Sequence, residues 1–143
     1  MQLRRMTKED LPQVEMIQRR IVRHEITPAF SKMLAKHTED EDMIGLVAEE
    51  NGKVIGFVLG ETKIGGFGTD ITGWLELISV EPERMGQGVG RSLSLEIFKE
   101  FAKAGVSEVL TAVRWDSGDM LAFFKSLGFD RSPFINLHVG VSA

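Results

Sequence analysis

Residues 80–91 read VEPERMGQGVGR and join two segments of different hydrophobic period. The segment from Ile71 to Val80 is apolar and typical of a strand, whereas the apolar residues from Gly88 to Ala104 recur at helical spacing. Three glycines alternate in the turn between them, and glycine lets neighbouring backbone amides point toward one site. The first amides of a helix lack an acceptor within it and lie at its positive dipole end. This turn therefore predicts a site for a phosphate or another anion.

Two familiar phosphate-binding motifs do not fit this turn. Counted from Gly86, the Rossmann fingerprint needs a glycine at the position of Arg91. The P-loop needs Ser or Thr after Gly-Lys, but Gly52-Lys53 is followed by Val54. A glycine-rich turn without any ligand is the other interpretation. We disfavour it because each glycine in a helix costs roughly 1 kcal/mol relative to alanine.

The rest of the chain alternates between strand and helix patterns. The apolar spacing predicts, in chain order, a strand at 3–6, a helix at 7–23, a short helix at 29–37, strands at 43–50, 54–63 and 106–114, a helix ending at Gly128 and a strand at 134–141. Thr7 and Asp10 are spaced as a capping box, and Asn51-Gly52 is typical of a hairpin turn. The order β-α-α-β-β-β-α-β-α-β predicts an α/β fold with a mixed, mainly antiparallel sheet flanked by helices.

The composition narrows the class of protein. The chain has 143 residues, of which 43% are hydrophobic and 27% charged, and this suits one globular domain over residues 1–143. It has no cysteine, no signal-like N-terminus and no apolar run near the roughly 18 residues of a membrane span. Its net charge of −4 disfavours nonspecific binding of nucleic acid. We therefore expect a cytoplasmic protein with no metal and with neither membrane nor nucleic acid as a partner.

Together with Val113-Arg114 and the segment FKSLGF at residues 124–129, the glycine turn resembles the GNAT family of acetyl-CoA-dependent N-acetyltransferases. The family's R/Q-x-x-G-x-G/A motif falls on residues 85–90. The resemblance implies a GNAT-like fold that transfers an acetyl group from acetyl-CoA, without a metal, to an amine of a small molecule or peptide. It implies that CoA is bound by main-chain groups of Ile78, Ser79 and Val80 along the pantetheine and by amides of Gly86, Gln87, Gly88, Val89, Gly90 and Arg91 around the pyrophosphate.

Four positions depart from the family pattern. Met85 stands where Arg or Gln is usual, and Ala112 where members that acetylate ribosomal proteins carry Glu. Ser117 stands where many members have an Asn that contacts pantetheine, and Phe124 where many have a Tyr that protonates the departing thiolate. The resemblance implies that both lie at the cofactor. Two hypotheses remain open: an active acetyltransferase, and a CoA-binding module with weak or lost catalysis.

Glu76 is our candidate for the general base that takes a proton from the amine. It is the only charged residue in the strand segment WLELISV at 74–80, and strand alternation places it on the face of Ile78 and Val80. Partial burial among apolar side chains would raise its pKa toward a useful range. The alternative is a strand-end Glu paired with a surface cation. Ser117 is a second catalytic candidate, as an acid, although the N-cap of the last helix is an equally simple role for it.

Two interpretations remain open for several further residues. His24, His37 and His138 lack metal-ligand spacing, so we expect them at the surface, with His138 as a candidate facing the acceptor. Arg84 and Arg91 flank the glycine turn and are either phosphate ligands or solvated. The segment GGFG at 65–68 is either a cover over the acceptor or a plain hairpin loop. An exposed final strand at 134–141 would make a homodimer plausible through edge pairing.

Overall fold

The structure is a computed structural model that describes residues 1–64 and 70–142. The chain divides into two compact units, residues 1–112 and residues 113–143. The first unit contains the whole sheet, and the second contains one helix. The expectation of one domain over the chain stays a prediction.

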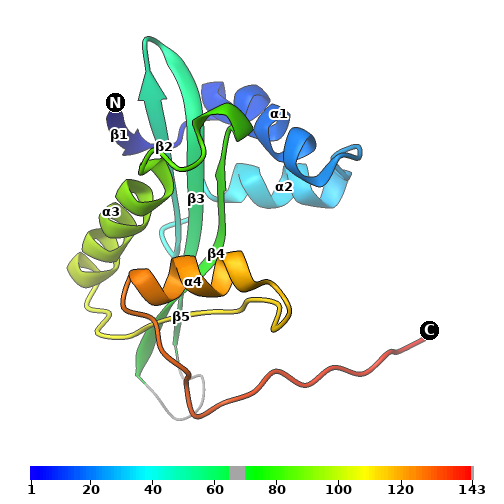
Figure 1. The fold of residues 1–143 in the computed structure, drawn as a ribbon, viewed down its shortest axis with the longest axis vertical. Helices are drawn as coiled ribbons and strands as arrows, with labels where there is room; N and C mark the ends of the chain where they lie inside the picture. Colours follow the sequence, from blue (N-terminus) through cyan, green and yellow to red (C-terminus); the bar gives the residue numbers. More distant parts are fainter. Residues whose placement is uncertain (65–69, 143) are drawn as a thin grey trace. The chain divides into compact units, whose positions relative to one another are not determined.

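The first unit is built on a five-stranded sheet in the order β1-β2-β3-β4-β5 (Figure 1). The strands are β1 (Gln2–Arg5), β2 (Met43–Glu50), β3 (Lys53–Ile64), β4 (Ile71–Val80) and β5 (Val109–Thr111). The first four pair antiparallel, and β5 pairs parallel to β4. The predicted mixed, mainly antiparallel sheet is therefore confirmed.

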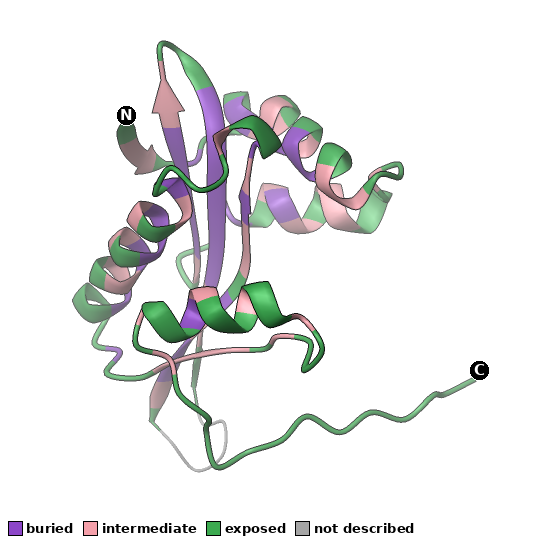
Figure 2. Ribbon diagram, in the orientation of Figure 1, coloured by how far each residue is buried: buried purple, intermediate pink, exposed green. Residues whose placement is uncertain are grey.

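Helices cover both faces of this sheet. Figure 1 shows α1 (Leu11–Val22) and α2 (Pro28–Lys36) on one face and α3 (Val89–Lys103) on the other. The buried residues of β2 and β3 lie between these helical layers (Figure 2). The core under α1 and α2 consists of apolar side chains, namely Met6, Val14, Ile17, Leu34, Val47, Val54, Phe57 and Leu59.

Under α3 the sheet is lined by small residues. A Cβ at Gly60 would lie 2.6 Å from Phe101 Cζ and 2.7 Å from Ile97 Cδ1. A Cβ at Gly73 would lie 2.8 Å from Phe101 Cδ1. These two glycines let the apolar face of α3 approach the sheet closely, since any larger side chain would collide with the Phe101 ring.

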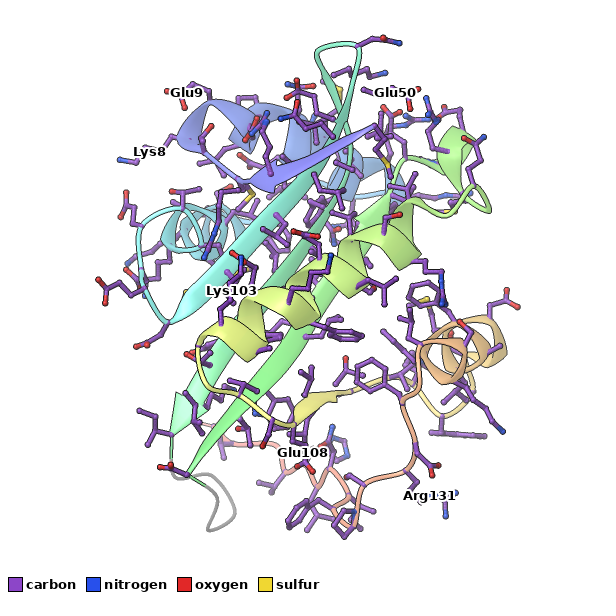
Figure 3. All side chains as sticks on the ribbon, turned by 90° about the vertical axis from the view of Figure 1, so that its left-hand side faces the viewer. Lys8, Glu9, Glu50, Lys103, Glu108 and Arg131 are labelled. Carbon is purple, nitrogen blue, oxygen red and sulfur yellow. The ribbon has the colours of Figure 1, made fainter. Side chains whose placement is uncertain are left out.

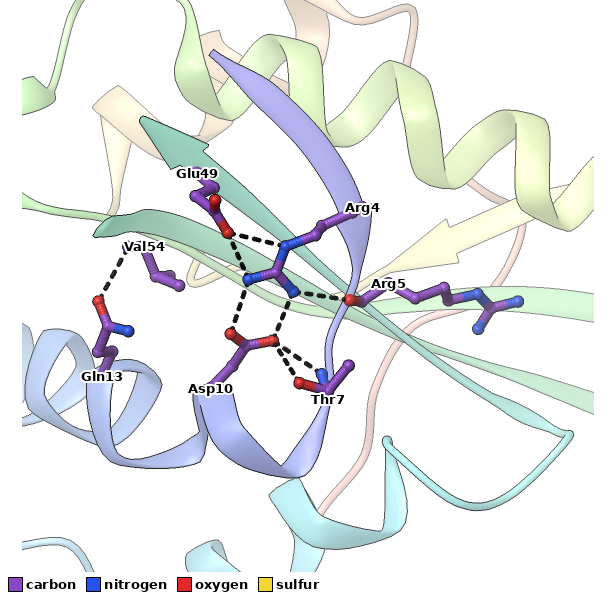
Figure 4. A network of polar contacts seen from close by, with 7 residues as sticks. All are labelled: Arg4, Arg5, Thr7, Asp10, Gln13, Glu49 and Val54. Atoms are coloured by element: carbon purple, nitrogen blue, oxygen red, sulfur yellow. Dashed lines mark hydrogen bonds and ion pairs between the residues drawn. The ribbon is translucent and has the colours of Figure 1, made fainter. Parts of the chain in front are cut away.

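A polar network ties β1, β2 and the start of α1 together (Figure 4). The short 3-10 helix η1 (Lys8–Asp10) precedes α1, and the Asp10 carboxylate accepts hydrogen bonds from the Thr7 amide at 2.8 Å and the Thr7 hydroxyl at 3.2 Å. The predicted capping box is therefore confirmed. The Arg4 guanidinium donates to both Asp10 oxygens, at 2.7 and 2.8 Å, and to Glu49 at 2.6 Å. The Arg4 bond lowers the pKa of the Asp10 carboxyl below its usual value.

The second unit contains α4 (Gly118–Ser126), which ends before Gly128 at a φ of +99°, as predicted. The Phe124 ring packs edge to face against Phe123 and Phe129, each with 5.4 Å between centroids.

The strand predicted at 134–141 is wrong. These residues have no regular secondary structure, and apolar side chains such as Leu137 and Val141 are 87% and 92% exposed. Their alternating pattern permits a strand, but a strand forms only against a neighbouring strand. Over its described residues the second unit offers none, so the homodimer expected from this strand edge loses its structural basis. β5 is also shorter than the predicted strand at 106–114.

Candidate active site

After β4 the chain forms the 3-10 helix η3 (Pro82–Arg84), passes through the glycine turn and enters α3. Gly86 and Gly88 adopt φ values of +79° and +86°, in the left-handed region that favours glycine. A Cβ built on either residue would meet no atom within 4 Å. The space beside these two glycines is therefore open.

Gly88 is the N-cap of α3, and its carbonyl accepts the Ser92 amide at 3.0 Å. The amides of Val89 and Gly90 precede this first helical bond and have no acceptor within the helix. No side chain of the described chain caps this terminus. Together with the positive end of the helix dipole, these amides provide the geometry of an anion site.

Charged side chains beside the turn are paired with one another. Arg84 donates to Glu50 at 2.6 Å and to the Gln87 side chain at 3.1 Å. Glu50, labelled in Figure 3, stands at the end of β2, and its bond from Arg84 lowers the pKa of its carboxyl. Arg84 is thus ion-paired and not simply solvated in this structure, and its role as a phosphate ligand stays a prediction. Arg91 lies in the first turn of α3.

The β4 edge that faces β5 is paired over only part of its length. β5 pairs with β4 at Gly73, Trp74 and Leu75. At the end of this pairing, the Thr111 hydroxyl donates a hydrogen bond to the Leu75 carbonyl at 2.8 Å. Beyond Leu75, the segment 76–80 has β3 on one side, and the five-stranded sheet supplies no strand on the other. An extended ligand would find an open strand edge there.

Glu76 occupies a β-bulge between the paired and the open part of β4. Leu59 pairs with Leu77 and Gly60 with Leu75, so Glu76 is the extra residue opposite the β3 step. The bulge interrupts the alternation of side chains between the two faces of the sheet. The Glu76 carboxylate therefore points to the α1–α2 side of the sheet, toward the end of α2. Val80 pairs with Gly56, which lies under α3. The expectation that Glu76 shares the face of Ile78 and Val80 is therefore wrong, because a bulge breaks the two-residue period.

The side chain of Glu76 is 36% exposed, so it is reachable but partly desolvated. Burial raises the pKa of its carboxyl, and the neighbouring Glu61 carboxylate raises it further. His37 and Lys63 act in the opposite direction and lower the pKa. The predicted direction of the Glu76 shift and its main cause, burial, are confirmed.

His37 is the functional candidate that the sequence analysis misplaced. We expected it at the surface, yet its side chain is 1% exposed. Its Nδ1 lies 2.9 Å from the Met33 carbonyl oxygen, and Nε2 is buried without a hydrogen-bond partner, 3.7 Å from Glu76 Oε1. A sequence signal for its burial exists: His37 continues the apolar face of α2 that Phe30, Met33 and Leu34 begin.

His24 and His138 are exposed. Ser117 is the N-cap residue of α4, without a side-chain cap bond, and Phe124 lies within the same helix. Both belong to the second unit, so their place at the cofactor stays a prediction. The segment 65–68 lies outside the described residues.

The described residues lack both a metal-binding cluster and a membrane-spanning helix. They contain no group of three His, Cys, Asp or Glu side chains that could hold a metal ion. None of their helices is long and apolar enough to cross a membrane.

Comparisons with known proteins agree with this geometry. The family model of the Acetyltransferase (GNAT) family matches residues 3–129. The mycothiol acetyltransferase of Amycolatopsis mediterranei is 37% identical over 95 residues, which cover 64% of this chain and 31% of that protein. The [ribosomal protein bS18]-alanine N-acetyltransferase of Escherichia coli K12 is 27% identical over 103 residues, covering 72% of this chain and 66% of that protein. The chain spans about a third of the length of the mycothiol acetyltransferases that it matches.

Solved structures show the same fold. The aminoglycoside acetyltransferase AAC(6')-Iy in complex with a CoA-containing bisubstrate analogue superimposes with a TM-score of 0.86 at 17% identity, covering 99% of this chain and 98% of that one. The aminoglycoside acetyltransferase meta-AAC0020 from a soil metagenomic sample, in complex with sisomicin, gives a TM-score of 0.81 at 16% identity, covering 99% and 96%.

Proposed function

The chain belongs to the acetyltransferase (GNAT) family, and from this premise we propose that it transfers an acetyl group from acetyl-CoA to an amine of a small molecule or peptide. One observation carries the proposal. The glycine turn at the start of α3, where Gly86 and Gly88 leave open space, adjoins a strand edge that is open from residue 76 to residue 80. The first feature suits a pyrophosphate and the second suits an extended pantetheine arm.

The residues of the turn and the strand edge fit acetyl-CoA. The amides of residues 86–91 would hold the pyrophosphate, since a Cβ at Gly86 or Gly88 would occupy the open space beside them. The main chain of Ile78, Ser79 and Val80 would pair with the pantetheine. When bound, acetyl-CoA supplies an activated acyl group and a thiolate leaving group. For Ser117 and Phe124 the proposed role in binding acetyl-CoA rests on the family resemblance alone.

Glu76 acts as the general base in this proposal. It lies at the end of the open edge that is nearest to β5, where an arm that follows residues 78–80 would end. Burial raises the pKa of its carboxyl, and this direction makes the carboxylate a stronger base. Its partial exposure leaves one side free for the amine.

The acceptor that this cluster favours is a cationic amine. Glu61 lies close enough to Glu76 to raise its pKa through charge and hydrogen bonding. Two carboxylates that repel each other gain when an ammonium group comes between them. The relatives named above act, by their names, on an alanine of a ribosomal protein and on aminoglycosides, and both acceptors carry amines.

A second candidate function is a CoA-binding module with weak or lost catalysis. The observation in its favour is the sequence itself, because Met85 replaces the usual Arg or Gln and Phe124 replaces the usual Tyr. Those positions affect a side-chain contact and an acid, whereas the backbone cradle does not depend on them.

Thermal unfolding with acetyl-CoA, CoA, NAD and ATP tests the cofactor. A ligand at one hundred times its Kd adds about 2.7 kcal/mol to the free energy of unfolding. We expect acetyl-CoA and CoA to raise the melting temperature and NAD to leave it unchanged. A rise with NAD or ATP alone would contradict the proposal.

Release of free CoA thiol, measured with sisomicin, spermidine and a peptide with N-terminal alanine, then tests turnover. We expect thiol release with at least one of these amines. Tight binding of acetyl-CoA without thiol release from any of them favours the binding module.

A further inference from the structure

The Nε2 atom of His37 is buried, and it has no hydrogen-bond partner among the described residues. Buried polar atoms are almost always hydrogen-bonded, because leaving one unpaired is destabilising. Nδ1 faces the Met33 carbonyl at 2.9 Å, and a carbonyl oxygen can only accept, so Nδ1 carries a hydrogen. In the neutral ring Nε2 is then a bare lone pair, buried 3.7 Å from Glu76 Oε1. This distance is slightly longer than a hydrogen bond, so a small approach of the two side chains would let one proton bridge both atoms.

The other charged groups around Glu76 come from β3. Glu61 raises the pKa of Glu76, and Lys63, whose ammonium lies 5.1 Å from the centroid of the Trp74 ring, lowers it. Glu61 can share a proton with Glu76 but repels a second negative charge, and Lys63 donates only. Within the described structure, His37 is the neighbour of Glu76 whose neutral form holds a lone pair ready for a proton.

Transfer of an acetyl group to an alkylammonium removes two protons from the nitrogen. One of them ends on the thiol of CoA, and the other is released to water, so that the ammonium and acetyl-CoA give the amide, free CoA and one proton. A lone carboxylate can hold only one proton at a time. A carboxylate beside an imidazole can hold two, one on each group.

We propose that the buried His37 and the partly exposed Glu76 form a two-proton store, in which Glu76 takes each proton from the acceptor nitrogen and His37 Nε2 accepts the first of them from Glu76. Glu76 is then again a carboxylate when the second proton leaves the nitrogen. The inference rests on the proposed function, because Glu76 must be the base. His37 is a positioning residue that acts through Glu76. The store also supplies the proton that the thiolate needs, at a site where Phe124 has no hydroxyl.

His37→Asn is the sharpest test, because the Asn side-chain amide nitrogen can replace Nδ1 and keep the bond to Met33 while Nε2 is lost. We expect kcat with acetyl-CoA and a reactive amine of the sisomicin, spermidine and peptide panel to fall about tenfold, below the effect of removing the base itself. KM for both substrates should stay within about twofold. The acid limb of the kcat profile should move to higher pH, because His37 no longer lowers the pKa of Glu76.

The matched control is His24→Asn. His24 is exposed, and its Nδ1 also faces a backbone carbonyl, that of the next residue, Glu25, at 3.0 Å. The control should keep wild-type kcat and pH profile. A folded His37→Asn variant with wild-type kcat and an unshifted acid limb would overturn the two-proton store while leaving Glu76 as the base. Full activity of Glu76→Gln would instead overturn the assignment of Glu76, and the store with it.

The nitrogen resonances of the three imidazoles give a readout that needs no acceptor. In the ligand-free protein we expect His37 Nδ1 to carry the hydrogen that faces Met33, and the Nε2 resonance to shift in Glu76→Gln, because Nε2 lies beside the Glu76 carboxylate. The resonances of His24 and His138 should be the same in both proteins. A His37 ring with a bare Nδ1, or an Nε2 signal indifferent to Glu76→Gln, would overturn the inference.

Discussion

The glycine turn at residues 86–90 and the Glu76–His37 pair present their functional groups in opposite ways. The turn offers backbone amides of consecutive residues, and its geometry follows from two positive φ angles and a helix start. The pair joins side chains from α2 and β4 that meet through a β-bulge and a packed helix end. A site made of backbone depends on local sequence, whereas a site made of distant side chains depends on how the elements pack.

We expect the largest effect from replacing Glu76, the proposed general base, because this change affects turnover but not the binding of acetyl-CoA at the glycine turn. Glu76→Gln keeps the shape of the side chain but accepts no proton, so we expect turnover to fall by roughly 10² to 10⁴. The wild-type rate should fall with decreasing pH through the raised pKa of Glu76, and the variant should lose this acid limb. Calorimetry should give an unchanged affinity for acetyl-CoA. Glu9→Gln is the control, since Glu9 is exposed on η1 (Figure 3). Near-wild-type turnover of Glu76→Gln would rule out the base.

The next effect tests the turn alone. Gly88→Asp places a Cβ and a negative charge in the open space beside the turn, so we expect the Kd for acetyl-CoA to rise at least about 100-fold. Gly52→Asp is a matched control, because Gly52 has a φ of +78° and is equally open but lies in the β2–β3 hairpin. It should show similar backbone strain and wild-type affinity. Equal affinities of the two folded variants would contradict the assignment of the turn.

Stability against pH distinguishes the scaffold from the site. Arg4 lowers the pKa of Asp10 in the folded state, so Asp10 stabilises the fold above its unfolded pKa of about 3.9, and this stability is lost as pH falls through the folded pKa. We expect Asp10→Asn to lower the free energy of unfolding by about 2 kcal/mol at pH 7 and by less at acidic pH. Denaturant titrations at several pH values measure both.

Glu76→Gln should have the opposite sign in the same titrations. The folded pKa of Glu76 is raised, so the stability that its protonated form contributes is present below the unfolded pKa and lost as pH rises through the folded one. Replacing the carboxylate should therefore stabilise the fold at pH 7. A destabilised Glu76→Gln would show that the carboxylate is needed for structure.

The smallest expected effect concerns Phe124→Tyr. If His37 and Glu76 already supply the proton that the thiolate needs, the added Tyr hydroxyl is not required as an acid. We therefore expect turnover to stay within about threefold of wild type. The hydroxyl joins a ring packed against Phe123 and Phe129, at a cost of about 1 kcal/mol. A tenfold gain in turnover would show that an acid is missing at this position. A loss of several kcal/mol would show that the ring belongs to a core away from the site.

The sequence by itself determined the elements whose cause is local. The period change at residues 80–91, the capping box of Thr7 and Asp10 and the hairpin at Asn51-Gly52 each follow from a few neighbouring side chains and backbone angles. The same holds for the end of α4 at Gly128. The order of strands in the sheet is the order of strands in the chain, as is common for consecutive strands.

Only the tertiary structure decided three other features. The alternating segment 134–141 stays without a strand, since a strand needs a partner edge that its own pattern does not provide. Glu76 changes face because a bulge is a property of the pairing between β3 and β4. The contact between His37 and Glu76 depends on how α2 packs against the sheet. The helical spacing of Phe30, Met33 and Leu34 with His37 indicates that His37 is buried, but it does not indicate that Glu76 is its neighbour.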